Sequence, residues 1–335
     1  MSHLTVEATD YHTAGEPFRI VTSSDIALEG RGILDKRAYA LENLDHVRRL
    51  LINEPRGHAD MYGCFVTTPE DSGADLGVVF FHNEGYSTAC GHGTIALVTW
   101  ALETGRLPRE GDEVEVIVDV PSGRLPTVAK IEGDRVSWVR FRNVPSFVHS
   151  AGVEVATSAG TVSTDISYGG AFYASVDASA LGLSVEPDNV SRFKELGREI
   201  KLVIEAEHEI AHPDEPRLEG VYGVIFFERQ PDETEALCQR NVTIYADREV
   251  DRSPCGSGTS ARLALLDATG ELARGRRLLH RGIVGGEFVA WVDGEAQVGG
   301  RPAVYTQIQG SAHVTGFHRF VLDPRDELGT GFILH

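Results

Sequence analysis

The stretch that decides the fold occurs twice in the chain: residues 90–94 read CGHGT and residues 255–259 read CGSGT. The two cysteines lie 165 residues apart, close to half of the 335-residue chain. A strand-like segment, 76–81 or 241–245, precedes each copy, and an apolar helical pattern ending near a glycine follows it. A repeat at half the chain length in matched contexts indicates two similar halves, each with a Cys-Gly-x-Gly turn between a strand and a helix.

The rest of the sequence is rich in strand patterns, with a few helices between them. Apolar alternation predicts strands at 17–22, 113–119, 126–131, 135–141, 161–166, 171–176, 221–228, 287–293 and 311–322. Helical patterns cover 44–53, 94–103, 190–207 and 260–269. These elements predict an α/β protein of the α+β kind. No linker marks a domain boundary, so the repeat alone places one within 120–150.

Composition excludes several classes of function. With 31 Lys+Arg against 50 Asp+Glu, the formal charge is −19, which argues against binding nucleic acid or an anionic membrane surface. No apolar run approaches the ~18 residues of a membrane helix, and the first ten residues do not resemble a secretory signal. We therefore expect a cytoplasmic protein whose four cysteines, none in a C-x-x-C pair, are free thiols.

The twin turns suggest a specific chemistry. A helix N-terminus presents unpaired N–H groups and partial positive charge, which suits a carboxylate and stabilises a thiolate. Two such turns facing each other would place one thiol on each side of a bound acid. One thiolate could then remove an α-proton while the other group, a thiol, returns a proton on the opposite face. A single such cysteine is more often a buried structural residue, but two in matched contexts favour the chemical interpretation.

Other motifs are weaker. Residues 208–212 read HEIAH, a pattern that on a helix can hold zinc through two histidines, but Pro213 ends a helix at this point, and a chance match is favoured. Asp251 could receive a substrate ammonium or only cap a turn. Cys64 and Cys238 lie outside glycine turns and are expected to be inert. Neither a P-loop nor G-x-G-x-x-G is present, so nothing in the sequence indicates a nucleotide cofactor.

Several blocks of sequence together resemble the proline racemase family, which includes proline racemases, hydroxyproline epimerases and trans-3-hydroxy-L-proline dehydratases. The matching blocks span nearly the whole chain and are 12–16, 54–63, 85–92, 169–172, 251–261 and 322–332. The resemblance implies a diaminopimelate-epimerase-like fold of two pseudo-symmetric halves, each a β-barrel-like sheet around a central helix, with the active site in the cleft between them. We expect residues 1–130 with a return segment at 318–335 in the first half, and 131–317 in the second.

The resemblance also assigns roles to individual residues. It implies that Cys90 and Cys255 are the catalytic acid and base, and that neither a cofactor nor a metal is needed. It implies that Asp251 receives the ring ammonium, that His92 assists, and that the protein is a homodimer acting on a small imino acid. The backbone amides expected to hold the substrate carboxylate are those of Gly91, His92, Gly256 and Ser257.

Departures from the family pattern leave the substrate open. Dehydratases usually carry Thr at the second cysteine position, so Cys255 favours racemisation or epimerisation of proline or a hydroxyproline-like imino acid. Tyr62 and Tyr245 stand where the ring-enclosing residues are usually Phe, which disfavours a 4-hydroxyl and suits a 3-hydroxyl or another polar substituent. The alternatives are trans-3-hydroxy-L-proline dehydration, inactivity on the standard proline derivatives and, remotely, a zinc hydrolase using His208 and His212.

Overall fold

The computed structural model describes residues 4–23, 25–233 and 235–334, and these residues form two compact units. The first contains the described residues up to Val139 and from Ser311 onward, and the second runs from Arg140 to Gly310. The expected boundaries were 130/131 and 317/318. The first unit instead ends within β8 (Arg135–Arg142), and β18 (Ala312–Leu322) pairs with β1 from its first residue.

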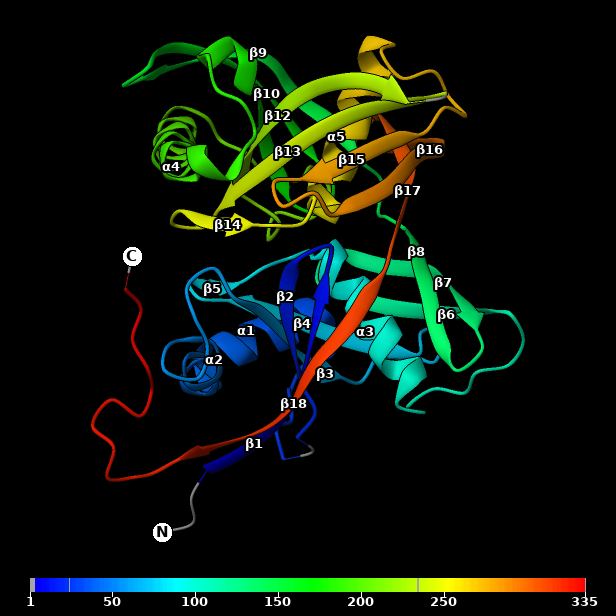
Figure 1. Cartoon of the computed structure of the whole chain (residues 1–335), viewed down its shortest axis with the longest axis vertical. Helices are drawn as coiled ribbons and strands as arrows, with labels where there is room; N and C mark the ends of the chain where they lie inside the picture. The colour runs from blue at the N-terminus through cyan, green and yellow to red at the C-terminus, as the bar shows by residue number, and fades with distance from the viewer. Residues whose placement is uncertain (1–3, 24, 234, 335) are drawn as a thin grey trace. The chain divides into compact units, whose positions relative to one another are not determined.

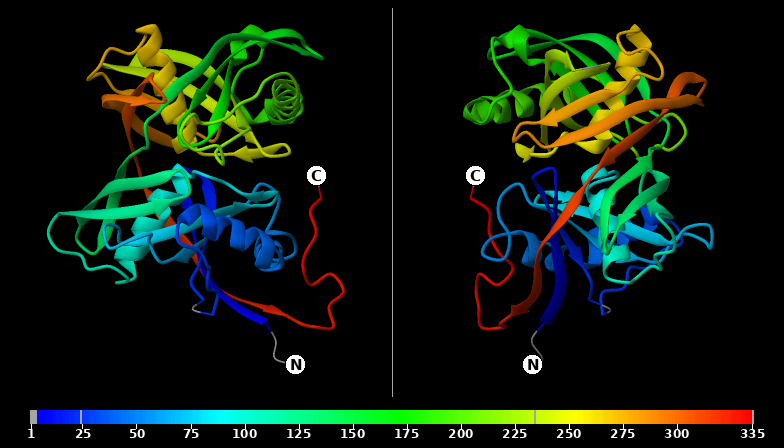
Figure 2. Two further views of the ribbon diagram at one scale, coloured as in Figure 1. Left: turned by 180° about the vertical axis from the view of Figure 1, so that it is seen from behind. Right: turned by 45° about the vertical axis from the view of Figure 1, so that its right-hand side comes forward.

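The first unit is one curved sheet with three helices. Besides β18, its strands are β1 (Leu4–Thr13), β2 (Glu16–Val21), β3 (Tyr62–Thr67), β4 (Leu76–His82), β5 (Gly85–Tyr86), β6 (Glu113–Val120) and β7 (Gly123–Glu132). The strand order is β18-β1-β2-β3-β4-β6-β7, with parallel pairing at β2–β3 and β4–β6 and antiparallel pairing elsewhere; β5 pairs with β4. Figure 2 shows the last strand, β18, lying beside the first strand, β1.

The curved sheet of the first unit encloses a central helix. Its helices are α1 (Ile33–Asn43), α2 (Asp45–Ile52) and α3 (Gly91–Glu103). Every residue of α3 from Gly91 to Leu102 is buried, and α3 contacts β1, β2, β3, β7 and β18. A helix that is apolar on all sides must be enclosed, which is why the strands wrap around it. The helices α1 and α2 instead pack on β4 from outside.

The second unit repeats this plan. Its strands are β9 (Phe147–Thr157), β10 (Gly160–Tyr168), β11 (Phe172–Asp177), β12 (Val221–Glu233), β13 (Ala236–Tyr245), β14 (Glu249–Asp251), β15 (Leu278–Gly282), β16 (Glu287–Val298) and β17 (Arg301–Gly310). Its helices are α4 (Val190–Glu207) and α5 (Gly256–Thr269), with short 3-10 turns η1 (Ala178–Leu181) and η2 (Pro187–Asn189). Figure 1 shows α5 among the strands and α4 on the outside of the sheet.

The two units share one topology. The order in the second unit is β9-β10-β11-β12-β13-β15-β16-β17, with parallel pairing at β11–β12 and β13–β15 and with β14 beside β13. The parallel pairs and the short extra strand thus occupy the same places in both orders. The two pseudo-symmetric halves and the fold class expected from the repeat are therefore confirmed, and α3 and α5 are equivalent central helices.

Most predicted elements are present, with differences at their ends. The helix at 190–207 has the predicted bounds, but α3 and α5 begin at Gly91 and Gly256 instead of at 94 and 260. The glycines are therefore the first helical turn itself, and each cysteine is the N-cap residue. Among the described residues, no helix has both the length and the apolar character needed to span a bilayer.

Candidate active site

In the first unit, the Cys90 turn is built by the close packing of a glycine. Cys90 caps α3 in an extended conformation, with φ −154°, and its Sγ accepts the N–H of Gly93 at 3.3 Å. A Cβ on Gly93 would lie 2.4 Å from the Phe18 ring and 2.7 Å from the Cys90 Sγ. Only glycine therefore lets the first turn of α3 approach the thiol this closely.

Two predicted residues lie beside Cys90. The His92 ring is buried, and its Nε2 lies 3.4 Å from the Cys90 Sγ, while Thr13 donates a hydrogen bond to the His92 carbonyl at 3.0 Å. The Tyr62 ring meets the His92 ring edge-on, with centroids 5.1 Å apart. The structure thus brings Cys90, His92 and Tyr62 together, with the amides of Gly91 and His92 in the first helical turn, where N–H groups have no intrahelical acceptor.

The Tyr62 hydroxyl belongs to a short hydrogen-bond chain that the sequence analysis did not anticipate. Tyr62 Oη donates to Ser87 Oγ, which in turn donates to the carbonyl of Ala89 at 3.1 Å. Because the single phenolic proton is used in this bond, the oxygen of Tyr62 is an acceptor toward any further partner. Ser87 carries no motif signal, so only the structure identifies its role.

In the second unit, Cys255 caps α5 in a left-handed conformation. Its φ is 61°, which is uncommon for a residue with a side chain. The preceding carbonyl of Pro254 accepts hydrogen bonds from Asn241 Nδ2 at 2.9 Å and Thr259 Oγ1 at 3.1 Å. A Cβ on Gly282 would lie 2.3 Å from the carbonyl oxygen of Arg252, so this glycine leaves the space in which the loop lies. These contacts hold Cys255 in a conformation that the residue alone would rarely adopt.

Asp251 lies in the same loop and affects the thiol. Its Oδ1 accepts the Ser253 N–H at 2.8 Å and the Ser253 hydroxyl at 2.7 Å. Burial raises the pKa of the Asp251 carboxyl to about 6. Burial, and after it the Asp251 charge, raises the pKa of Cys255 to about 12. Hydrogen bonds from Tyr173, Gly258 and Ser257 act in the opposite direction but are outweighed. At neutral pH, Cys255 is therefore a thiol.

The remaining predicted residues of the second unit lie around this loop. Gly256 and Ser257 form the first turn of α5, as expected for amides that would receive a carboxylate. Tyr245 ends β13, is buried, and stacks on Tyr222 with ring centroids 5.5 Å apart. Tyr222 in turn contacts the ring of Tyr173, a residue of β11 that the sequence analysis did not single out.

The HEIAH segment does not form the structure that a zinc motif requires. The helix α4 ends at Glu207, and His208 is extended, with φ −132°. His212 lies beyond the helix end, and its Nδ1 accepts the N–H of Asp214 at 3.2 Å. The two histidines therefore do not share a helix face, and the zinc-hydrolase alternative loses its structural basis. In residues 4–23, 25–233 and 235–334, no group of three or more His, Cys, Asp or Glu could hold a metal ion.

The other two cysteines are packing residues of the strands. Cys64 in β3 and Cys238 in β13 are both almost fully buried. Burial raises the pKa of Cys64 well above its ordinary value, so this thiol stays protonated and unreactive at neutral pH.

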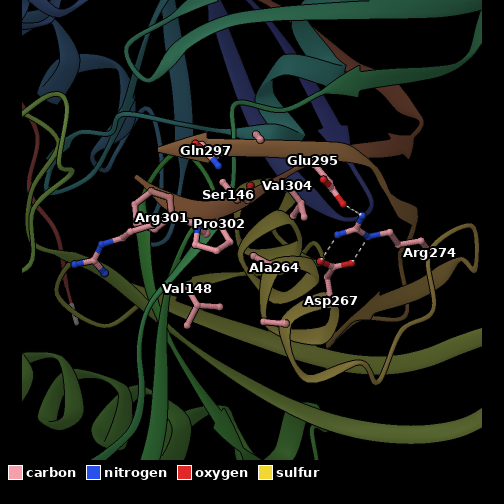
Figure 3. A pocket seen from close by; sticks show the side chains of 14 residues that line it. Ser146, Val148, Ala264, Asp267, Arg274, Glu295, Gln297, Arg301, Pro302 and Val304 are labelled. Carbon is pink, nitrogen blue, oxygen red and sulfur yellow. Dashed lines mark hydrogen bonds and ion pairs between the residues drawn. The ribbon is translucent and has the colours of Figure 1, made fainter. Parts of the chain in front are cut away.

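A pocket of about 680 Å³ opens at the other end of α5 (Figure 3). It is lined by the C-terminal half of α5, the end of β16, the start of β17 and the start of β9, with Ala264, Pro302 and Val304 among its apolar residues. Arg274 forms ion pairs with Asp267 and Glu295 there. Because these charges satisfy one another and the pocket is several turns from Cys255, it is not part of the predicted site.

Comparison with known proteins identifies the class to which this architecture belongs. The chain belongs to the proline racemase family, whose model, described as proline racemase, matches residues 8–333. The match covers both cysteine turns and both units, as the sequence resemblance implied.

The curated relatives include enzymes named for activities on 3-hydroxyproline. The chain is 46% identical to a trans-3-hydroxy-L-proline dehydratase of Bacillus cereus over 325 residues, covering 97% of each protein. It is 45% identical to a 3-hydroxyproline 2-epimerase of Burkholderia multivorans over 332 residues, covering 98% of each. Two activities on one kind of substrate are thus named among relatives of nearly equal similarity.

Solved structures confirm the fold. A hydroxyproline epimerase of Agrobacterium vitis, crystallised with bound trans-4-hydroxy-L-proline, is similar with a TM-score of 0.92 and 33% identity, covering 98% of this chain and 96% of that one. A PhzF-family phenazine biosynthesis protein of Bacillus anthracis, with a TM-score of 0.58 and 14% identity over 95% of this chain and 99% of that one, shows a likeness of fold alone.

Proposed function

We propose that this protein is an epimerase that moves a proton at the α-carbon of a 3-hydroxyproline-like imino acid, using Cys90 and Cys255 as its two acid–base groups. The observation that carries the proposal is that the N-cap residue of both equivalent central helices is a cysteine. The substrate class is supported by the 3-hydroxyproline activities named for relatives of about 45% identity.

The second unit supplies the proton donor and the charge partner in this proposal. Cys255 is protonated at neutral pH because it is buried beside Asp251. A substrate ammonium placed at Asp251 would neutralise that carboxylate and so remove one cause of the high thiol pKa. Proton donation by Cys255, and proton removal by it in the reverse direction, then become compatible with one bound substrate.

The first unit supplies the opposite group. The Gly93 N–H and the His92 ring are both within hydrogen-bonding distance of the Cys90 Sγ, and each can stabilise a thiolate there. We infer that the two cysteine turns receive one substrate, with the carboxylate held by the amides of Gly91, His92, Gly256 and Ser257. The helix termini would then stabilise the negative charge that develops on the carboxylate as the α-proton leaves.

Tyr62 supports a 3-hydroxylated ring. Because its proton is donated to Ser87, its oxygen can accept a hydrogen bond from a substrate hydroxyl. An acceptor stabilises a hydroxyl that stays on the ring. It does not supply the proton that a departing hydroxyl would need. This arrangement favours epimerisation over elimination.

Dehydration of trans-3-hydroxy-L-proline is the second candidate, because that activity is named for the relative with 46% identity. Elimination needs a base for the α-proton and a proton for the hydroxyl, which departs as water, and one group can take the first proton and supply the second. Epimerisation needs an acid on the opposite face of the α-carbon. The two reactions therefore differ in whether both cysteines are required.

The test is incubation of trans-3-hydroxy-L-proline with the enzyme in D2O, followed by NMR and chiral chromatography. We expect cis-3-hydroxy-D-proline labelled with deuterium at C2, and loss of its formation in both Cys90→Ala and Cys255→Ala. A pyrroline carboxylate as the main product, with one cysteine variant still active, would select the dehydratase. Absence of both products from trans-3-hydroxy-L-proline, together with no deuterium exchange into it, proline or the 4-hydroxyprolines, would reject both.

Assembly and location remain predictions. We propose a homodimer located in the cytoplasm, as the family resemblance and the composition suggest. Light scattering of the purified protein tests the assembly, and a single-chain mass in solution would contradict it.

A further inference from the structure

We propose that Tyr173 is a positioning residue for Cys255, whose hydroxyl bridges the thiol and Ser257 and supports the thiolate form by donating a hydrogen bond to it. Tyr173 Oη lies 3.6 Å from the Cys255 Sγ and 2.7 Å from the Ser257 Oγ. All three side chains are buried. The inference deepens the proposed function, since it concerns how one of the two cysteines can change its protonation state.

The position of Tyr173 is set by the glycine-containing turn that precedes its strand. A Cβ on Gly169 would lie 2.2 Å from the carbonyl oxygen of Ser257 and 2.6 Å from the amide of Ala261. The turn between β10 and β11 therefore lies directly against the first turn of α5. The Asn143 side chain fixes it by donating to the Gly169 carbonyl at 2.8 Å. Tyr173 follows four residues later on β11, and its ring reaches the N-terminus of α5.

The hydrogen-bond direction in this cluster can reverse. Tyr173 and Ser257 each have one hydroxyl proton, and either oxygen can be the donor in their mutual bond. When Cys255 is a thiolate, Tyr173 donates to sulfur and Ser257 donates to Tyr173. When Cys255 is a thiol, Tyr173 can donate to Ser257 instead. The same three groups thus satisfy both protonation states through rotation of hydroxyl groups alone.

The thiolate of Cys255 needs such a donor. Burial and the charge of Asp251 both oppose ionisation here, and the hydrogen bonds from Tyr173 and the Gly258 N–H act in the opposite direction. At Cys90 the His92 imidazole lies within hydrogen-bonding distance of the thiol. The two equivalent turns therefore use different chemical groups to support their thiols.

The test compares Tyr173→Phe with its parent by the pH dependence of Cys255 alkylation. Both are made in an Asp251→Asn background, which removes the acidic charge and moves the titration toward an accessible pH range. Iodoacetamide is the reagent, and peptide mass spectrometry separates Cys255 from the other three cysteines. We expect Tyr173→Phe to raise the inflection by about one pH unit, because a hydrogen bond to a charged group is lost.

Tyr168→Phe is the matched control. Tyr168 is also buried and lies in the adjacent strand, but its hydroxyl has no hydrogen-bond partner among the residues that the structure describes. Its removal is expected to leave the inflection unchanged. A purely structural effect of Tyr173→Phe would instead lower the plateau rate of alkylation without moving the inflection.

Ser257→Ala provides a second variant if Tyr173→Phe does not fold. It removes the donor to Tyr173 and also the Ser257 hydroxyl that lies 3.9 Å from the Cys255 Sγ, so a smaller rise of the inflection than in Tyr173→Phe is expected. An unchanged inflection in both variants would overturn the inference. The measurement needs no substrate, so its failure would leave the proposed epimerase activity to be judged by deuterium exchange alone.

Discussion

Replacement of Asp251 by Asn is expected to stabilise the protein while removing its activity. Burial raises the pKa of the Asp251 carboxyl from 3.8 to about 6. The unfolded chain therefore loses the proton at lower pH than the folded chain does. Because the folded state binds this proton more tightly, the protonated carboxyl contributes to the free energy of unfolding. The contribution is fully present below about pH 3.8, and it is lost as the pH rises through about 6. An amide has no charge to bury and avoids this loss.

The magnitude follows from the shift. About two pH units correspond to about 3 kcal/mol at pH 8, where Asp251 is ionised in both states, and to about 1 kcal/mol at about pH 4.5. Both hydrogen bonds from Ser253 reach one oxygen, Oδ1, and the Asn carbonyl can accept them both. The Cys255 side chain also supports the carboxylate by a hydrogen bond, so we expect most but not all of the electrostatic gain to appear in Asp251→Asn.

The assay is urea unfolding followed by circular dichroism, for both proteins at about pH 4.5 and about pH 8. The free energy of unfolding of the variant should exceed that of the wild type by an amount that grows with pH. Turnover should be lost, because the proposed ammonium partner is neutral. A variant that is less stable than the wild type at pH 8, or a difference independent of pH, would refute the reasoning.

Three further predictions concern buried positions. Gly93→Ala is expected to lower turnover by about 100-fold, because the new Cβ would lie 2.7 Å from the Cys90 Sγ and displace it; steady-state kinetics measures this. Gly169→Ala should lower the free energy of unfolding by about 1–3 kcal/mol, because its Cβ would overlap the Ser257 carbonyl; urea denaturation measures it. Burial, then the nearby Arg262 charge, lowers the pKa of His280 to about 3, so NMR should show no titration of this ring between about pH 5 and pH 8.

Each of these predictions has an outcome that contradicts it. Wild-type turnover in Gly93→Ala would mean that the thiol position is not set by this contact. Unchanged stability of Gly169→Ala would mean that the β10–β11 turn can move away from α5. A titrating His280 would show that the ring is accessible to protons. A His280 pKa of about 3 in the folded state means that the unfolded state binds this proton first, so the folded state should lose stability as the pH falls below about 6.5. If the folded ring titrated normally, this loss of stability would be absent.

The sequence predicted the duplicated plan well because the repeat carries strong local chemistry. Packing against the Phe18 ring and the Cys90 Sγ requires glycine at position 93, and the same requirement makes the motif visible in the sequence. The helices α3 and α5 begin three or four residues earlier than the sequence predicts, because their glycines form the first helical turn and not a turn before the helix. Burial overrides their low helix propensity there.

Features that depend on contacts between distant residues were not predictable. Tyr173 lies 82 positions from Cys255 in the chain, and only the fold brings its hydroxyl to the thiol. The block at 169–172 was a visible signal, but its role in pressing a turn onto α5 needed the structure. The left-handed conformation of Cys255 was equally hidden, since it is imposed by Asn241, Thr259 and Gly282.

The pairing of β18 with β1 has a consequence for how the chain matures on the ribosome. The register pairs Leu4 with Leu322 and Thr13 with Ala312. One edge of β1 therefore stays unpaired until β18 is synthesised, after the whole second unit. The second unit is continuous in sequence and can close as soon as it emerges. We therefore expect the later-made unit to fold first, while the earlier one keeps an unpaired strand edge, open to aggregation, until translation nears its end.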